Sequence, residues 1–266
     1  MKTHWPVLVV ANKSQDLVDQ GAITRDRGSV KNEAVAKYTD YRSNGPTTLE
    51  RHAELQSAYD ELIESHDEHF EVVRDICGTN GSGRTTPLAL CDFVILSVLN
   101  RSLDLVDGFL WSFNRWNLST SAPAVRMQVD NVLRLSLLSR AGPGPVVDLL
   151  LSGDPLNKVR DPLAPPDKKF KLTDERLRLY ARDRFPWLDL VYEKSSGWVH
   201  FSSVHIGVTL DVKEDGNLFG RFPSDISRYP FDFLEQVLWS MNEATSGVLD
   251  IAREFASAKA EALGNT

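Results

Sequence analysis

Apolar residues recur at helical spacing along most of the chain. Steps of three and four place them on one face of a helix. Such stripes run through residues 55–73, 88–113, 125–136, 177–192 and 234–255. The stripe over residues 88–113 is the widest, because further leucines and phenylalanines lie beside it, and it predicts a helix buried on more than one side. The pattern predicts a mostly α protein.

Polar residues and prolines mark where these helices begin. Thr47 and Glu50 have the spacing of a capping box, in which each side chain accepts a hydrogen bond from the other's backbone N–H. Thr86-Pro87 and Ser121-Ala122-Pro123 place a proline in a first helical turn, where its missing N–H costs nothing. These signals predict helix starts at about residues 47, 86 and 121.

Two segments depart from helical spacing. Apolar residues alternate over residues 204–212, and Asp215-Gly216-Asn217 is a turn signal, so a small β-hairpin is expected near residues 203–222. Residues 141–167 hold six of the thirteen prolines, which predicts irregular structure with at most one short helix. Proline disfavours helix interiors because it lacks the N–H donor.

The domain organisation follows from these segments. Residues 1–45 are polar and aperiodic and are interpreted as an N-terminal extended arm. Residues 46–266 are predicted to form a single helical bundle of about six helices, with the proline-rich loop 141–167 as a surface excursion. The alternative is a domain boundary at this loop, which would leave a C-terminal piece of only about 100 residues.

Composition and charge exclude some classes of protein. With 42% apolar and 25% charged residues, the chain is neither disordered, nor collagen-like, nor a disulfide scaffold. Its 37 acidic against 30 basic residues argue against nucleic-acid binding unless basic groups gather on one face. No apolar run is long enough for a membrane span or a signal peptide, so no membrane partner and a cytoplasmic location are expected. Cys77 and Cys91 are expected to be reduced.

Two motifs are better explained by structure than by ligand binding. The segment 78–85, GTNGSGRT, resembles a phosphate-binding loop, but a helix precedes it and Arg84 stands in place of the lysine. His66 and His69 are three residues apart without an evident third ligand, so a solvated acidic helix surface is expected there. The sequence therefore predicts no metal and no cofactor.

One charged line lies on an otherwise apolar helix. Arg126, Asp130 and Arg134 are four residues apart and share a face. Arginine can bind a phosphate or carboxylate through two parallel hydrogen bonds. Together with Lys194, these three residues are the candidate ligand-binding residues.

A second segment offers candidate catalytic residues. Tyr192, Ser196 and His200 share a face if the helix continues past Gly197. Imidazole can transfer protons near neutral pH, and a hydroxyl beside it can act as a nucleophile. The alternative is a buried hydrogen-bond network that joins two helices and does no chemistry.

These residues also carry a resemblance to a known family. A long buried helix, an R-x-Q-x-D-N helix and then a Y-x-x-x-S-G-[aromatic]-V-H-x-S segment look like uncharacterised bacterial helical proteins that are distantly similar to the HEPN superfamily. The HEPN superfamily consists of helical bundles found in toxin and phage-defence RNases. The resemblance covers residues 88–206, and the matching positions are Arg126, Asp130, Asn131, Tyr192, Ser196, Gly197, His200 and Ser202.

The resemblance implies a nucleic-acid-binding or RNase function in bacterial defence, an RNA partner and a homodimer. Catalytic HEPN proteins carry an arginine four to six residues before a histidine, whereas here Lys194 stands six residues before His200. Lysine is a point charge without the planar fork of a guanidinium. Two other functions remain open: a non-catalytic protein-interaction module with a structural polar network, and a hydrolase acting on a small phosphorylated ligand.

Overall fold

The computed structural model describes residues 46–78, 87–199, 210–212, 218–220 and 229–263. Contacts between α-carbons divide the chain into Met1–Gly45 and Pro46–Thr266, and the described residues all belong to the second unit. This division falls at the residue where the sequence separates the arm from the helical domain. The predicted arm itself lies outside the described residues.

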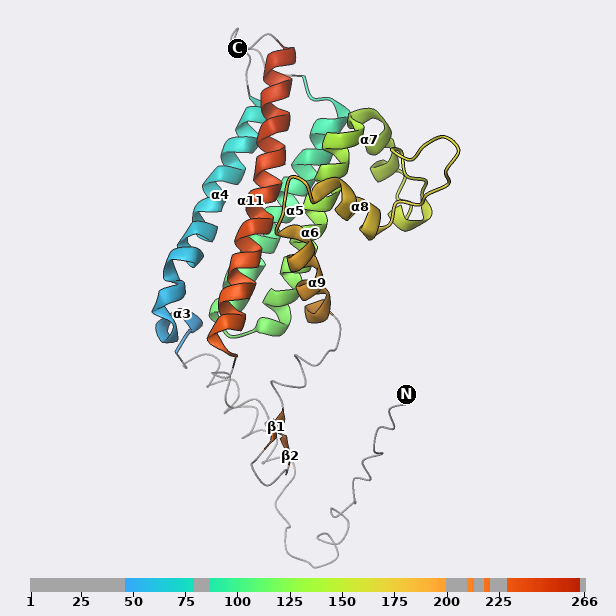
Figure 1. Cartoon of the computed structure of the whole chain (residues 1–266). Coiled ribbons are helices and arrows are strands. Elements are labelled where there is room, and N and C mark those ends of the chain that lie inside the picture. Colours follow the sequence, from blue (N-terminus) through green and yellow to red (C-terminus); the bar gives the residue numbers. More distant parts are fainter. Residues whose placement is uncertain (1–45, 79–86, 200–209, 213–217, 221–228, 264–266) are drawn as a thin grey trace, which may run out of the picture. The chain divides into compact units, whose positions relative to one another are not determined.

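The described residues are mostly helical, as predicted, but they form eight α-helices rather than about six (Figure 1). The helix at the start is interrupted, and short helices form around the proline-rich segment, which raises the number. In chain order the helices are α3 (Thr48–Arg51), α4 (Gln56–Cys77), α5 (Leu90–Asn114), α6 (Leu118–Ala141), α7 (Pro143–Leu151), α8 (Asp174–Ala181), α9 (Leu188–Val199) and α11 (Phe231–Ala262), with 3-10 turns at Ala53–Leu55 and Leu156–Lys158.

Helix α6 is the centre of the bundle. It packs against α5 and α11 as well as against the shorter α7, α8 and α9, while α4 lies beside α11 and α5 (Figure 1). Fourteen of its 24 residues are buried, a larger share than in α5, whose stripe is the widest in the sequence. Buried polar groups are usually hydrogen-bonded, so the polar side chains on the buried faces of α6 are expected to find partners inside the bundle.

The predicted capping box is present, but the helix it opens is short. Glu50 N donates to the Thr47 hydroxyl at 3.2 Å, and Thr47 N donates to the Glu50 carboxylate at 2.6 Å. The helix stops at His52, whose φ of −130° and ψ of 69° leave the helical region. The His52 ring lies between Trp116 and Phe231, with centroid distances of 5.8 and 5.6 Å, so tertiary packing decides this break.

Helix α5 begins at Leu90, so the start predicted at Thr86-Pro87 is wrong by about one turn. The Asp92 carboxylate accepts from Ala89 N at 2.6 Å, which caps the helix at that point. The same buried carboxylate receives Lys259 Nζ at 2.8 Å, and Lys259 also donates to the Ile76 carbonyl. The cap therefore depends on a lysine that is distant in sequence.

Helix α6 starts at Leu118, three residues before the predicted Ser121, and it includes Pro123. A tight connection from α5 makes this possible, because Trp116 adopts a φ of 59° and its indole donates to the Pro46 carbonyl at 2.9 Å. Burial of the Trp116 ring stabilises a backbone conformation that an L-residue rarely adopts.

The remaining segments agree in part with the sequence. The hairpin predicted over residues 203–222 is not confirmed as a whole: β1 (Leu210–Val212) pairs antiparallel with β2 (Leu218–Gly220), and the rest of this segment lies outside the described residues. The proline-rich segment contains the short helix α7, which begins with its proline in the first turn. Among the described helices, none has both the length and the apolar character to cross a membrane.

Two glycines inside helices give a matched test of this packing. At Gly247 of α11, an added Cβ would lie 3.3 Å from Trp187 and Val132 and 3.4 Å from Phe185, whereas at Gly108 of α5 nothing lies within 4 Å. Alanine is favoured over glycine in helices by about 1 kcal/mol, so we expect Gly108→Ala to stabilise the protein by roughly that amount. Overpacking should cancel this gain in Gly247→Ala.

The measurement is the free energy of unfolding in urea for both variants and the wild type. Gly247→Ala should be less stable than Gly108→Ala by at least about 1 kcal/mol. Equal stabilisation by the two alanines would show that α11 does not approach α6 as closely as described.

Candidate functional site

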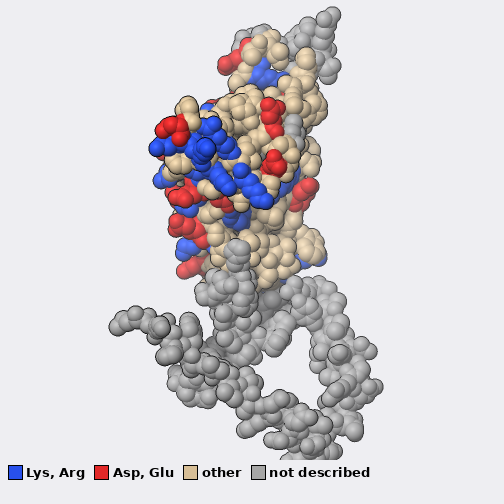
Figure 2. All heavy atoms as spheres, turned by 90° about the vertical axis from the view of Figure 1, so that its right-hand side faces the viewer, with Lys and Arg blue, Asp and Glu red and all other residues tan. Residues whose placement is uncertain are grey.

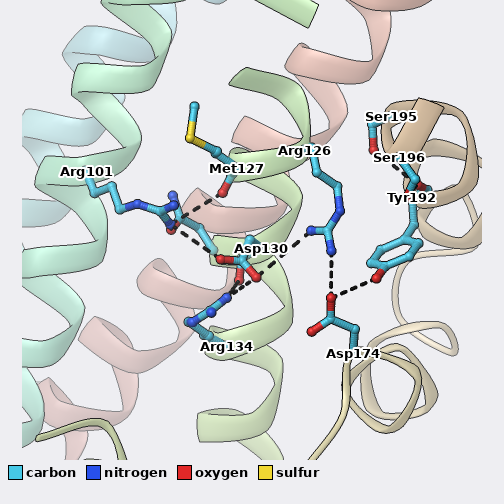
Figure 3. A network of polar contacts seen from close by, with 10 residues as sticks. Arg101, Arg126, Met127, Asp130, Arg134, Asp174, Tyr192, Ser195 and Ser196 are labelled. Carbon is cyan, nitrogen blue, oxygen red and sulfur yellow. Dashed lines mark hydrogen bonds and ion pairs between the residues drawn. The ribbon is translucent and has the colours of Figure 1, made fainter. Parts of the chain in front are cut away.

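The structure brings Arg126 and Tyr192 together through an acidic residue. The Arg126 guanidinium and the Tyr192 hydroxyl both donate to Asp174 Oδ2, each at 2.8 Å (Figure 3). The Arg126 guanidinium also lies 4.1 Å from the centroid of the Tyr192 ring, which is a cation–π contact. Asp174, the first residue of α8, therefore joins α6 to α9.

Two of the three catalytic candidates, Tyr192 and Ser196, lie within the described residues, and both hydroxyls form hydrogen bonds. Ser196 Oγ donates to the Tyr192 carbonyl one helical turn earlier at 2.8 Å, and within the described residues no base contacts this hydroxyl. Burial and the hydrogen bond to Asp174 raise the pKa of Tyr192 above its ordinary value, and the neutral phenol donates to Asp174. His200 lies outside the described residues, and Lys194 is exposed on α9 without a hydrogen bond or ion pair in the described part of the chain.

Three arginines converge on Asp130. Arg134 forms the closest ion pair, Arg101 lies at 3.9 Å and Arg126 at 4.0 Å (Figure 3). Arg101 comes from α5 and was not predicted from the sequence. Burial and the nearby Arg134 lower the pKa of Arg101, while the charge of Asp130 acts in the opposite direction.

From Arg101 a chain of hydrogen bonds runs into the core. Arg101 Nη1 donates to the Asn131 side-chain oxygen, and Asn131 Nδ2 donates to Gln128 Oε1 at 2.9 Å. The Gln128 amide nitrogen donates to Ser102 Oγ at 2.6 Å and to Thr245 Oγ1 at 3.1 Å. Asn131, Gln128, Ser102 and Thr245 are all buried.

The chain ends at His69, which is buried and not part of a solvated surface, so the sequence-based expectation for this residue is wrong. Its Nδ1 lies 2.6 Å from the Ser65 carbonyl and its Nε2 lies 2.9 Å from Ser102 Oγ. Because a carbonyl only accepts, Nδ1 carries the proton and Nε2 accepts from the serine hydroxyl. His66 is half-buried, and its Nε2 lies 2.7 Å from an Asp107 carboxylate oxygen.

Every link of this chain therefore donates inward, from the Arg101 cation to the Ser65 carbonyl. The participants come from α4, α5, α6 and α11, so the chain fixes the relative positions of four helices. Fully satisfied networks of this kind specify packing. No cluster of three side chains suited to metal binding occurs within the described ranges.

A pocket opens where the network reaches the surface between α5 and α6. Its volume is about 420 Å³. One wall is apolar and the other is charged, and the lining residues are Phe93, Val94, Ser97, Val98, Arg101, Asp130, Asn131 and Arg134.

A second polar feature is the segment 158–171, which we call the basic loop. The backbones of its two ends pair. Asp161 N donates to the Phe170 carbonyl at 2.9 Å, and Arg160 and Lys171 form an isolated antiparallel β-bridge. The Asp161 side chain is fully buried and accepts from Arg176 of α8 at 2.9 and 3.0 Å and from the Tyr180 hydroxyl. The loop is therefore anchored to α8 by a buried carboxylate.

The basic loop carries five basic residues against two acidic ones, and one of the acidic residues is the buried Asp161. Figure 2 shows Lys and Arg side chains gathered on the side that carries α7, α8 and the loop between them, with acidic side chains at the edges. All five cations are exposed: Lys158, Arg160, Lys168, Lys169 and Lys171.

Sequence reasoning missed most of these partners. Gln128 and Asn131 are polar positions among the buried residues of α6, and polar residues at core positions are a usable signal. Nothing in the sequence marks Asp161 and Arg176 as partners, because the fold of the basic loop is what brings the two side chains together. Comparison with family models, curated proteins and solved structures finds no match for the chain, so the similarity to HEPN proteins stays a prediction.

The buried imidazole makes stability depend on pH. Burial lowers the pKa of His69 below the ordinary value of 6.5; the hydrogen bond to the Ser65 carbonyl acts in the opposite direction, and nearby charged residues have smaller effects. The unfolded chain then binds a proton on this imidazole more readily than the folded chain does. The contribution of His69 to stability is therefore fully present above about pH 6.5, and it is lost as the pH falls from there toward the lower pKa of the folded state. His69→Gln should lower stability at pH 8 but reduce the further loss between about pH 7 and pH 5.

Urea unfolding at several pH values measures this effect. His66→Gln, three residues away on the same helix, is the matched control. It should retain the dependence of unfolding free energy on pH that comes from His69. An unchanged slope in His69→Gln would contradict a neutral, buried imidazole.

Proposed function

We propose that the protein binds single-stranded RNA through the basic loop. The observation that carries this proposal is the exposed Phe170 ring, 43% accessible, between Lys169 and Lys171. An aromatic ring on which a base can stack, flanked by cations for the phosphates, is the combination used to bind single strands.

The charge of the loop is available to a ligand. Lys158, Lys169 and Lys171 form no side-chain hydrogen bond or ion pair within the described residues. Release of counterions from RNA by such cations contributes affinity that does not depend on sequence. The overall charge of −7 does not oppose this, because basic groups are concentrated on one face.

The loop is also held in place before binding. Arg160 Nη2 donates to the carbonyls of Pro165, Pro166 and Lys168 at 3.1 to 3.4 Å. Arg176, paired with Asp161, lies 4.9 Å from the Phe170 ring. A preorganised surface loses less conformational entropy on binding.

Binding without cleavage is the form of the proposal that the described residues favour. The hydroxyls of Tyr192 and Ser196 are engaged in contacts between and within helices. The RNase activity and the defence role implied by the resemblance to HEPN proteins depend on His200 and remain proposals with their own test.

The test of binding uses fluorescence anisotropy with a labelled single-stranded RNA of about 15 nucleotides. Replacing Lys158, Lys169 and Lys171 together with alanine should weaken binding by one to two orders of magnitude at roughly 0.1 M salt. The slope of log affinity against log salt concentration should become less steep by about two units. Phe170→Ala should weaken binding about tenfold with little change in salt dependence.

The matched control removes the same charge elsewhere, by replacing the exposed Arg51, Arg74 and Arg115 with alanine. Equal weakening by this control would show that net charge, and not the basic loop, governs binding. The same RNA tests cleavage: degradation by the wild type that His200→Ala abolishes, with folding verified by circular dichroism, would add an RNase activity. Intact RNA with both proteins would restrict the function to binding.

A further inference from the structure

We propose that the pocket between α5 and α6 binds a small organic anion: a ligand with an aromatic or apolar body and one carboxylate or phosphate group. This site is separate from the basic loop and does not depend on RNA binding. It is composed of residues from two helices whose positions the buried network fixes.

The first argument is the orientation of two guanidinium groups. Every hydrogen bond and ion pair of Arg101 and Arg134 within the described residues uses Nη1, toward Asp130, Asn131 and the Met127 and Asp130 carbonyls. The Nε and Nη2 groups of both arginines are therefore without a protein partner in the described part. That edge of a guanidinium is one that can accept a carboxylate or phosphate through two parallel hydrogen bonds.

The second argument is the charge balance at the pocket. Arg101 and Arg134 share one carboxylate, Asp130, while the neighbouring Arg126 is neutralised by Asp174. One positive charge in the pocket thus has no counter-charge among its lining residues. Burial lowers the pKa of Arg101, and the positive charge of Arg134 acts in the same direction, while Asp130 acts against both.

The third argument is the opposite wall. Phe93 is 52% exposed and lines the pocket beside Val94 and Val98. An exposed phenylalanine against two arginines suits a ligand with an apolar end and an anionic end. The volume of about 420 Å³ lies within the range of about 300–1,000 Å³ that is typical of small-molecule sites.

The test titrates the full chain with phenyl phosphate, benzoate and inorganic phosphate by NMR. The signals followed are the arginine Nε–H groups and the methyl groups of Val94 and Val98. We expect phenyl phosphate or benzoate to shift these signals and to bind at least about tenfold more tightly than inorganic phosphate, because only they contact Phe93. The tighter of the two identifies the anionic group as phosphate or carboxylate.

Three variants locate the site. Arg134→Gln should weaken binding at least about tenfold by removing one bidentate donor. Ser97→Trp should abolish binding by filling the pocket from an exposed position, which leaves the buried network intact. Arg115→Gln is the matched control and should bind like the wild type, since Arg115 lies 4.6 Å from the exposed Trp111 ring outside the pocket.

Absence of binding by both organic anions would overturn the proposal. So would binding that Ser97→Trp leaves unchanged, or that Arg115→Gln weakens as much as Arg134→Gln does. If Arg134→Gln does not fold, Ser97→Trp and Arg115→Gln still decide the outcome.

Discussion

Gln128 is completely buried in α6, and its amide must find hydrogen bonds inside the bundle. It finds them on α5 through Ser102, on α11 through Thr245 and within α6 through Asn131. An unsatisfied buried amide costs about 1–3 kcal/mol, so these helices can pack only where all the bonds form at once. Apolar packing alone would tolerate sliding of one helix along another, whereas this constraint selects one register.

The same register determines the surface chemistry. Because Asn131 is oriented by Gln128, it accepts from Arg101, and this brings a cation of α5 beside Asp130 of α6. One turn away on the same face of α6, Arg126 pairs with Asp174, and this contact attaches α8 and α9. Buried and exposed polar groups therefore form one continuous arrangement, in which the core positions the charged groups at the surface.

Much of the helical architecture could be predicted from local pattern. The stripes of α4, α5, α6 and α11 and the cap at Thr47 depend on residues only three or four apart. Errors occurred where a distant residue decided a local feature. Lys259 contributes to the start of α5, and His52 leaves the helix where its ring packs between Trp116 and Phe231.

The candidate site divides in the same way. The alignment of Arg126, Asp130 and Arg134 on one face is a property of helical spacing, so the sequence by itself determined it. Only the tertiary structure decided that Arg101 joins them, that His69 lies at the buried end of the hydrogen-bond chain and that Asp161 anchors the basic loop. The physical reason is that hydrogen bonds and ion pairs act over a few ångströms, and which distant residues come that close is decided by packing.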